Sequence, residues 1–393
     1  MAELQRLLHT EVFTFEPLKA LLSGVEPSTS STTTVGNLNG NTGTQPVNAN
    51  VAQPLLNLNR SSPGFNANLN TTNLNTTATI TIDNQGHANL NTNVSATVTR
   101  GPTKQEIDLN QARPSPQQAT ADSNANLTDV AHLLDVVHEA PSDGQKDLIN
   151  QVTDTVVDAH LATTVNTQAN ILEANERIDK EKDAPEQLDN ASPSVLWQQF
   201  TSAMLPELTK VVNFTKKLPG FSELNAEDQV QLIKQGSFEV MVARISLLID
   251  EINQEMLDPQ LKLKCSRNIV REMPMGPLID QMFEVAEQLN PMRLTDGEIG
   301  LFTAALIITP ERSGLKNTTA VRTIHRLFLQ ALYCSLKQTH ADADHTFRSL
   351  LSLLPLLKNI NESHTRFLNN IKAKSPAMFS SQFPQLHKEV FDN

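Results

Sequence analysis

The sequence has few cysteines and few aromatic residues, and each shortage excludes a class of protein. Its 393 residues include two cysteines, Cys265 and Cys334, which cannot form the disulfide framework of a small secreted domain. They also cannot supply all four thiolates of a single zinc site. No apolar run of about 18 residues occurs, so no membrane-spanning helix is predicted. The net charge of −12 argues against nucleic-acid binding by the chain as a whole, because phosphate contacts need a basic face.

The sequence also lacks the motifs that identify common enzyme classes. It contains no nucleophile elbow, no phosphate-binding glycine loop, no His-Glu-x-x-His pair and no usefully spaced pair of carboxylates. The histidines are scattered and predict no metal site. The start of the chain carries Glu3 and lacks the apolar core of a signal peptide. We therefore expect an intracellular protein that is not an enzyme.

Composition divides the chain into two parts. Residues 31–100 contain 16 Asn and 14 Thr, and the triplet Asn-Leu-Asn occurs there five times at irregular spacing. Such a segment has too few apolar residues to offset chain entropy, so we expect disorder rather than a stacked β-solenoid. Lys and Arg number 6 in residues 1–143 and 25 in residues 144–393. We expect a disordered leader or hinge over 1–143 and one folded domain over 144–393.

The second part has the apolar spacing of helices almost throughout. Residues 301–308 are apolar nearly all round, which predicts a helix buried in the middle of the domain. Thr295 and Glu298 form a capping-box pattern just before it. Residues 261–265 alternate with period two and predict the edge of a small hairpin. The expected fold class is all-α.

One stretch is more specific than periodicity. Phe214-Thr215-Lys216-Lys217-Leu218-Pro219-Gly220-Phe221 is followed by Leu224, Asp228-Gln229 and Leu232-Ile233-Lys234. This resembles the signature of nuclear-receptor ligand-binding domains. Residues 236–244, 301–304, 311–314 and 383–391 extend the resemblance to the end of the chain. It implies a three-layer antiparallel helical sandwich with a very small β-hairpin, and a terminal activation helix at 383–391.

Within the family, the chain is most similar to the retinoid-related orphan receptors and their insect and nematode relatives of the moulting pathway. Residues 157–160 resemble their first helix, and Trp197-Gln198 opens a helix as theirs does. The spacing from His364 to the closing segment also matches theirs. The haem-binding Rev-erb group has a histidine at the place of His364, but it generally ends before any activation helix. The presence of that helix here favours the first group.

The resemblance implies a surface groove that holds Leu-x-x-Leu-Leu helices of coactivator proteins. Such a helix has unpaired N–H groups at its start and unpaired carbonyls at its end. Glu389 at one end of the groove and Lys216 at the other would satisfy both, and Lys234 would line the far rim. The alternative is that these lysines are ordinary solvated residues. We expect the terminal helix to dock or detach at low cost and so to act as a switch.

The resemblance also implies a buried ligand pocket and a structural ion pair. The matching pocket positions are Trp197, Phe200, Leu208, Arg244, His364 and His387. Leu247 stands where the orphan receptors usually have a second arginine, which argues against sterol binding in their manner. His387 stands where the terminal helix usually carries a tyrosine that bonds the histidine, and two neutral imidazoles can still pair as donor and acceptor. Glu239 and Arg312 match the ion pair.

The resulting hypothesis is a nuclear receptor that regulates transcription by recruiting coactivator helices, gated by a small lipophilic ligand. The alternative is a haem- or redox-sensing repressor that binds corepressors, with His364 as haem ligand. No cysteine precedes Cys265 to serve as the second ligand of a Rev-erb-like site, so we expect no cofactor. We expect nuclear localisation, no membrane contact and a receptor dimer partner. DNA reading would need a zinc-finger module that this sequence does not contain.

Two further Leu-x-x-Leu-Leu matches lie near the N-terminus, at residues 4–8 and 18–22. One hypothesis is that one of them docks into the domain's own groove or into another receptor. The alternative is an ordinary amphipathic segment, because leucine-rich helices produce this pattern often. The sequence alone favours the ordinary segment.

Overall fold

The computed structural model describes residues 2–10, 12–22, 77–82, 88–93, 133–139, 141–180, 206–259, 263–272 and 275–391. The chain divides into two compact units. One comprises Met1–Thr29 with Pro116–Asn393, and the other comprises Ser30–Ser115.

The smaller unit contains one antiparallel hairpin. Strand β1 (Thr77–Ile82) pairs with β2 (Ala88–Asn93) in a register that runs from Thr77 opposite Asn93 to Ile82 opposite Ala88. The triplet at 89–91 therefore lies in β2. The other residues of 31–100, for which disorder was expected, lie outside the described residues.

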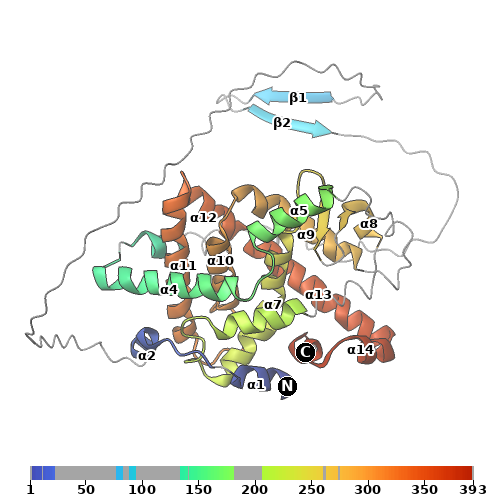
Figure 1. Cartoon of the computed structure of the whole chain (residues 1–393). Helices are drawn as coiled ribbons and strands as arrows, with labels where there is room; N and C mark the ends of the chain where they lie inside the picture. Colours follow the sequence, from blue (N-terminus) through green and yellow to red (C-terminus); the bar gives the residue numbers. More distant parts are fainter. Residues whose placement is uncertain are drawn as a thin grey trace, which may run out of the picture. The chain divides into compact units, whose positions relative to one another are not determined.

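The larger unit is helical, as expected (Figure 1). Its middle is formed by α10 (Asp296–Ile307) and α7 (Ala226–Ser246), which pack against each other. Helices α4 (Asp143–Leu161) and α11 (Thr318–Thr339) cover α10, while α9 (Gly276–Leu289) and α13 (Leu354–Lys374) cover α7. Further helices among the described residues are α5 (Gln168–Lys180), α8 (Arg267–Arg271), α12 (Ala343–Ser352), α14 (Pro376–Gln382) and α15 (Gln385–Phe391), with a 3-10 turn at Asn290–Met292. Residues 133–138 and 206–216 are helical as well.

A small three-stranded antiparallel sheet completes this unit. Its order is β3 (Ile249–Asp250), β4 (Glu255–Asp258) and β5 (Leu263–Ser266). The alternating residues 263–265 lie in β5, so the small hairpin predicted from the sequence is confirmed.

Helix α10 is buried on all sides because its residues are apolar nearly all round. Its capping box is formed as predicted: the Thr295 N–H donates to a Glu298 carboxylate oxygen at 2.8 Å, and the Glu298 N–H donates to the Thr295 hydroxyl at 3.2 Å. Gly300 lets α4 approach closely, because a Cβ there would lie 2.9 Å from the Cβ of His160. The predicted central helix is therefore confirmed.

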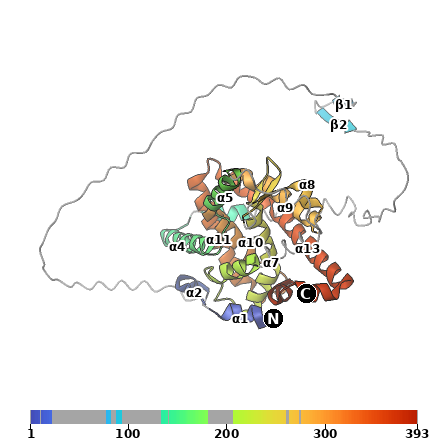
Figure 2. The same ribbon diagram turned by 45° about the vertical axis from the view of Figure 1, so that its right-hand side comes forward.

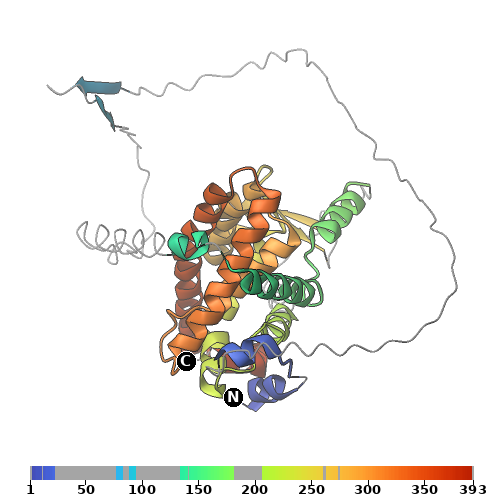
Figure 3. The ribbon, with the colours of Figure 1, turned by 90° about the vertical axis from the view of Figure 1, so that its left-hand side faces the viewer.

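Two short helices near the start of the chain pack on the same unit. They are α1 (Ala2–His9) and α2 (Glu16–Leu22), drawn in blue in Figures 1 to 3. The side chains of Leu4 and Leu18 are completely buried. A helix this short gains its stability from such packing rather than from propensity. These two helices were not expected, because the sequence predicted a disordered leader over residues 1–143. The predicted domain boundary at residue 144 stays a prediction.

Candidate functional site

A groove lies where the chain turns between two helices and meets its C-terminal helix. It is bordered by Lys216 at the end of the helical residues 206–216, by residues 221–224 and by the start of α7, and α15 packs against α7 beside it; we call it the α15 groove. Gly220 has φ +83°, a left-handed conformation that glycine adopts without strain. Asn225 then starts α7, since its side chain accepts a hydrogen bond from the Asp228 N–H at 2.9 Å. These two residues fix the angle between the groove walls.

Helix α1 lies against α15 and is capped there by a carboxylate. The N–H of Leu4 donates to Glu389 at 2.8 Å, and the N–H of Glu3 donates to its other oxygen at 3.3 Å. These are among the first N–H groups of α1, which have no partner within the helix. Burial alone would raise the pKa of Glu389, but the hydrogen bonds from Leu4, Gln385 and Glu3 outweigh it and lower the pKa to about 2. Glu389 is therefore ionised, and its negative charge stabilises α1 because it lies at the positive, N-terminal end of the helix dipole.

The other end of α1 is held through a hydroxyl group. The ammonium of Lys216, which is buried, donates to Thr10 Oγ1 at 3.0 Å. The same hydroxyl donates to the carbonyl oxygen of Leu7 at 2.8 Å. Lys216 therefore reaches the carbonyl of Leu7, in the last turn of α1, by way of Thr10. The same carbonyl also accepts the Thr10 N–H at 3.3 Å. The two contacts fix the length and the direction of the helix between Lys216 and Glu389.

The apolar face of α1 is the Leu-x-x-Leu-Leu face. Leu4 and Leu8 are buried and Leu7 is half-buried, whereas Gln5 and Arg6 between them are exposed. A crevice of about 260 Å³ remains beside the end of α1; it is bordered by Leu8, Lys216, Phe221 and Val230 among others. The first Leu-x-x-Leu-Leu match, α1, thus packs into the chain's own groove with Leu4 and Leu8 in the core, as one of the two hypotheses from the sequence expected. Sequence reasoning had no signal for Thr10.

The second match, in α2, docks elsewhere. Leu18 lies over the Gly220 turn: a Cβ on Gly220 would lie 3.1 Å from Leu18 Cδ1 and 2.8 Å from Ile324 Cδ1 of α11. Phe15, just before α2, is also buried. Leu21 is 48% exposed, so α2 uses only part of its motif for packing. The predicted rim residue Lys234 is half-buried on α7, and no bond or ion pair is seen for it within the described part of the chain.

A cluster of aromatic rings lies under α15. The ring of His364 on α13 stacks on Phe238 of α7 at 3.7 Å and 1°, and Phe391 of α15 meets its edge at 4.9 Å. His387 of α15 is 5.9 Å from His364, in a T-shaped contact. Each histidine has a buried Nδ1 that finds no partner among the described residues. The structure thus brings these two predicted residues together by ring contact.

Both of these histidines are neutral at physiological pH. Burial lowers the pKa of His387 to about 4. Burial, and then the neighbouring His387, hold the pKa of His364 well below its usual 6.5. The packing under α15 therefore depends on uncharged rings.

Two other predicted pocket residues, Arg244 and Leu208, lie among the described residues. Arg244 is fully buried, lies over the Phe214 ring at 4.4 Å, and donates to the Thr163 carbonyl and to His160. Burial lowers its pKa to about 10, and the charge of Glu207 opposes that shift. Leu208 is core, and Trp197 and Phe200 lie outside the described residues. Arg244 therefore ties α4 to α7.

The predicted ion pair is formed with both terminal nitrogens, Nη1 and Nη2, of the guanidinium group. Arg312 donates to the two carboxylate oxygens of Glu239 at 2.8 and 2.6 Å, and also to the carbonyl of Leu306 at 2.9 Å. Asn361 of α13 adds a hydrogen bond to Glu239 at 3.1 Å. These contacts join α7, the segment after α10, and α13.

Comparison with known proteins agrees with this geometry. Residues 192–373 match the model for the ligand-binding domain of nuclear hormone receptors. Over these matched residues the chain is a nuclear-receptor ligand-binding domain. It is 34% identical over 173 residues to nuclear receptor subfamily 1 group D member 2 of Rattus norvegicus, covering 44% of this chain and 30% of that protein. It is 26% identical over 333 residues to nuclear receptor ROR-beta of Rattus norvegicus, covering 78% of this chain and 69% of that protein.

This family is one of binding domains rather than enzymes, in line with the prediction from the sequence. The described residues bring together no group of three His, Cys, Asp or Glu that could hold a metal ion. Within the same residues, no helix is both long and apolar enough to cross a membrane.

Haem does not fit the ligand-binding domain in this arrangement. His364, the expected iron ligand, has one ring face covered by Phe238 at 3.7 Å. Its edges are covered by Phe391 and His387 of α15. A porphyrin would have to displace these rings.

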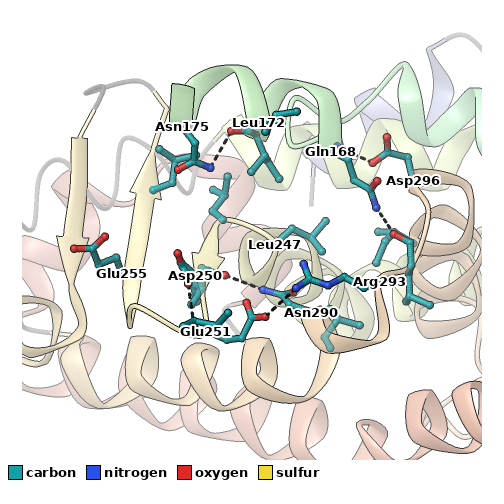
Figure 4. Close-up of a pocket in the computed structure, with 18 of the residues that line it drawn as sticks. Gln168, Leu172, Asn175, Leu247, Asp250, Glu251, Glu255, Asn290, Arg293 and Asp296 are labelled. Carbon is teal, nitrogen blue, oxygen red and sulfur yellow. Dashed lines mark hydrogen bonds and ion pairs between the residues drawn. The ribbon is translucent and has the colours of Figure 1, made fainter. Parts of the chain in front are cut away.

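The domain also has an open pocket of about 490 Å³ next to the small sheet (Figure 4). Helix α5 forms one wall, where the N–H of Gln168 donates to Asp296 at 3.0 Å. Leu247, three residues after Arg244, lies in the opposite wall. Asn290 closes the floor by donating to the carbonyls of Ser246 and Ile249. Of the predicted pocket residues that the structure describes (Leu208, Arg244, His364 and His387), none lines this space.

Proposed function

We propose that this chain regulates transcription in the nucleus, and that its ligand-binding domain recruits Leu-x-x-Leu-Leu helices of coactivator proteins through the α15 groove. Lys216 and Glu389 hold the two ends of the bound helix, and Lys234 lines the rim. The observation that carries the proposal is the seating of a Leu-x-x-Leu-Leu helix, α1, between Lys216 and Glu389. A groove that holds one helix of this pattern at both ends suits another of the same length and direction.

The position of α15 supports a role for this helix as a switch. It supplies Glu389 to the groove and Phe391 and His387 to the ring cluster beneath. Any change in the packing of the cluster therefore moves Glu389. A small lipophilic ligand that packs against these rings would shift the docked population of α15 and with it the affinity for the partner helix. We also propose corepressor helices and a second receptor as binding partners of this domain.

The proposal is tested by measuring the binding of a synthetic Leu-x-x-Leu-Leu peptide. The background is a full-length chain that carries Leu4→Ala and Leu8→Ala, which frees the groove. Adding Lys216→Ala or Glu389→Ala should weaken peptide binding about tenfold, because charges at a helix terminus contribute about 1–2 kcal/mol. Lys217→Ala is the matched control, since Lys217 is the exposed neighbour of Lys216. Equal affinity in all four chains contradicts the proposal.

A further inference from the structure

The groove proposed to bind coactivators is already filled by the chain's own first helix. Leu4 and Leu8 belong to the buried core of the ligand-binding domain. Glu389 and Lys216, the two residues that would hold a coactivator helix, are both engaged by residues 3–10. A second helix cannot use the same carboxylate, ammonium and apolar floor at the same time.

We infer that residues 2–10 are an intramolecular mimic of a coactivator helix, and that they keep the ligand-binding domain inhibited until a partner displaces them. The inference rests on the proposed function of the α15 groove, and it identifies α1 as the helix that competes with a coactivator for that groove. It requires that the docked and the free states of α1 both occur, with the docked state favoured.

The second anchor makes docking within one chain favourable. Six residues, 10–15, separate α1 from α2, and they extend no further than about 20 Å. Helix α2 is itself held on the domain by Leu18 and Phe15. A released α1 therefore stays near the groove, at an effective concentration on the order of millimolar, as a short tether provides. Because α1 is tethered, it can compete with a free partner helix for the groove even if it makes no more contacts than that partner.

The composition of α1 favours exchange with a partner over permanent packing. Its eight residues place two leucines in the core, while Gln5, Arg6 and His9 remain exposed. The 260 Å³ crevice beside Leu8 shows that α1 leaves part of the groove unfilled. A partner helix with bulkier side chains at this end would gain apolar contacts that α1 lacks.

The test compares the affinity of three full-length chains for a synthetic Leu-x-x-Leu-Leu peptide. In the first variant, Leu4→Ala and Leu8→Ala remove the buried face of α1. In the control, Gln5→Ala and Arg6→Ala change the exposed face of the same helix. We expect the first variant to bind the peptide at least tenfold more tightly than the unmodified chain, and the control to bind like the unmodified chain. Equal affinity in the unmodified chain and the first variant overturns the inference.

Hydrogen exchange of residues 2–10 in the same chains separates this inference from the proposed function. If no chain binds the peptide, the proposed function fails. The inhibitory contact is then supported only if residues 2–10 exchange slowly in the unmodified chain and quickly in the first variant. Fast exchange in both chains overturns it. Measuring the exchange at several chain concentrations adds one more outcome: protection that appears only as the chain dimerises assigns α1 to the groove of a second copy and overturns docking within one chain.

Discussion

The carboxylate of Glu389, four positions before the last residue, accepts a hydrogen bond from the backbone N–H of Leu4 at 2.8 Å. This one contact closes the chain on itself and places a Leu-x-x-Leu-Leu helix where a partner's helix is expected. The hydrogen bond therefore requires both that α1 occupies the groove and that α15 is docked.

Thr10 connects Lys216 to α1, so removing its hydroxyl should loosen that end of the helix. We expect Thr10→Val to make the amides of residues 2–10 exchange roughly 5- to 30-fold faster, because a hydrogen bond to a charged group contributes about 1–2 kcal/mol. Thr14→Val is the control, since Thr14 is exposed between α1 and α2. Unchanged exchange in Thr10→Val would show that the hydroxyl bridge contributes nothing to docking.

The paired histidines should make the docking of α15 depend on pH. The pKa of His387 is lowered to about 4 and that of His364 lies well below 6.5, so the unfolded or detached form binds more protons between these values. Stability from this cluster is complete above about pH 6.5 and is lost as pH falls toward 4. The His387→Phe variant should show a weaker dependence of its thermal unfolding temperature on pH between about 4 and 6.5. His345→Phe, at an exposed position of α12, should leave it unchanged.

The ion pair between Glu239 and Arg312 should be costly to break. We expect Arg312→Met to destabilise the domain by about 3–5 kcal/mol in urea unfolding, because it leaves the carboxylate of Glu239 buried without its partner. Arg177→Met removes an exposed ion pair on α5 and should cost at most about 1 kcal/mol. Similar costs for the two variants would contradict a structural role for the buried pair.

The fold was largely predictable from the sequence, because its signals are local. The all-round apolar residues of α10 and the spacing of Thr295 and Glu298 specify a central capped helix without any tertiary information. The motif around Pro219 and Gly220 predicted the groove in a different way, through the family resemblance that it carries. The occupant of the groove was not predictable in this way. Leu4 and Leu18 have the same pattern, and only the docked structure shows that one meets Glu389 while the other meets Gly220.

The turn at Gly220 supports both the groove wall and the seat of Leu18. Gly220→Ala should cost about 1–3 kcal/mol, because φ is +83° and the added Cβ would lie within 3.1 Å of Leu18 and Ile324. Residues 2–10 should exchange faster in this variant as the α2 anchor loosens. Gly144→Ala is the control: nothing lies within 4 Å of its added Cβ, and it should be neutral or slightly stabilising. Unchanged exchange in Gly220→Ala would show that α1 docks independently of α2.

The most direct test of the account is hydrogen exchange of residues 2–10 in the unmodified chain while a Leu-x-x-Leu-Leu peptide is added. The account predicts slow exchange without peptide, since Glu389 and the groove hold α1. It predicts exchange that accelerates in proportion to peptide occupancy, as α1 leaves the groove. Peptide binding that leaves the protection of residues 2–10 unchanged would show that the two helices use different sites, and would contradict the account.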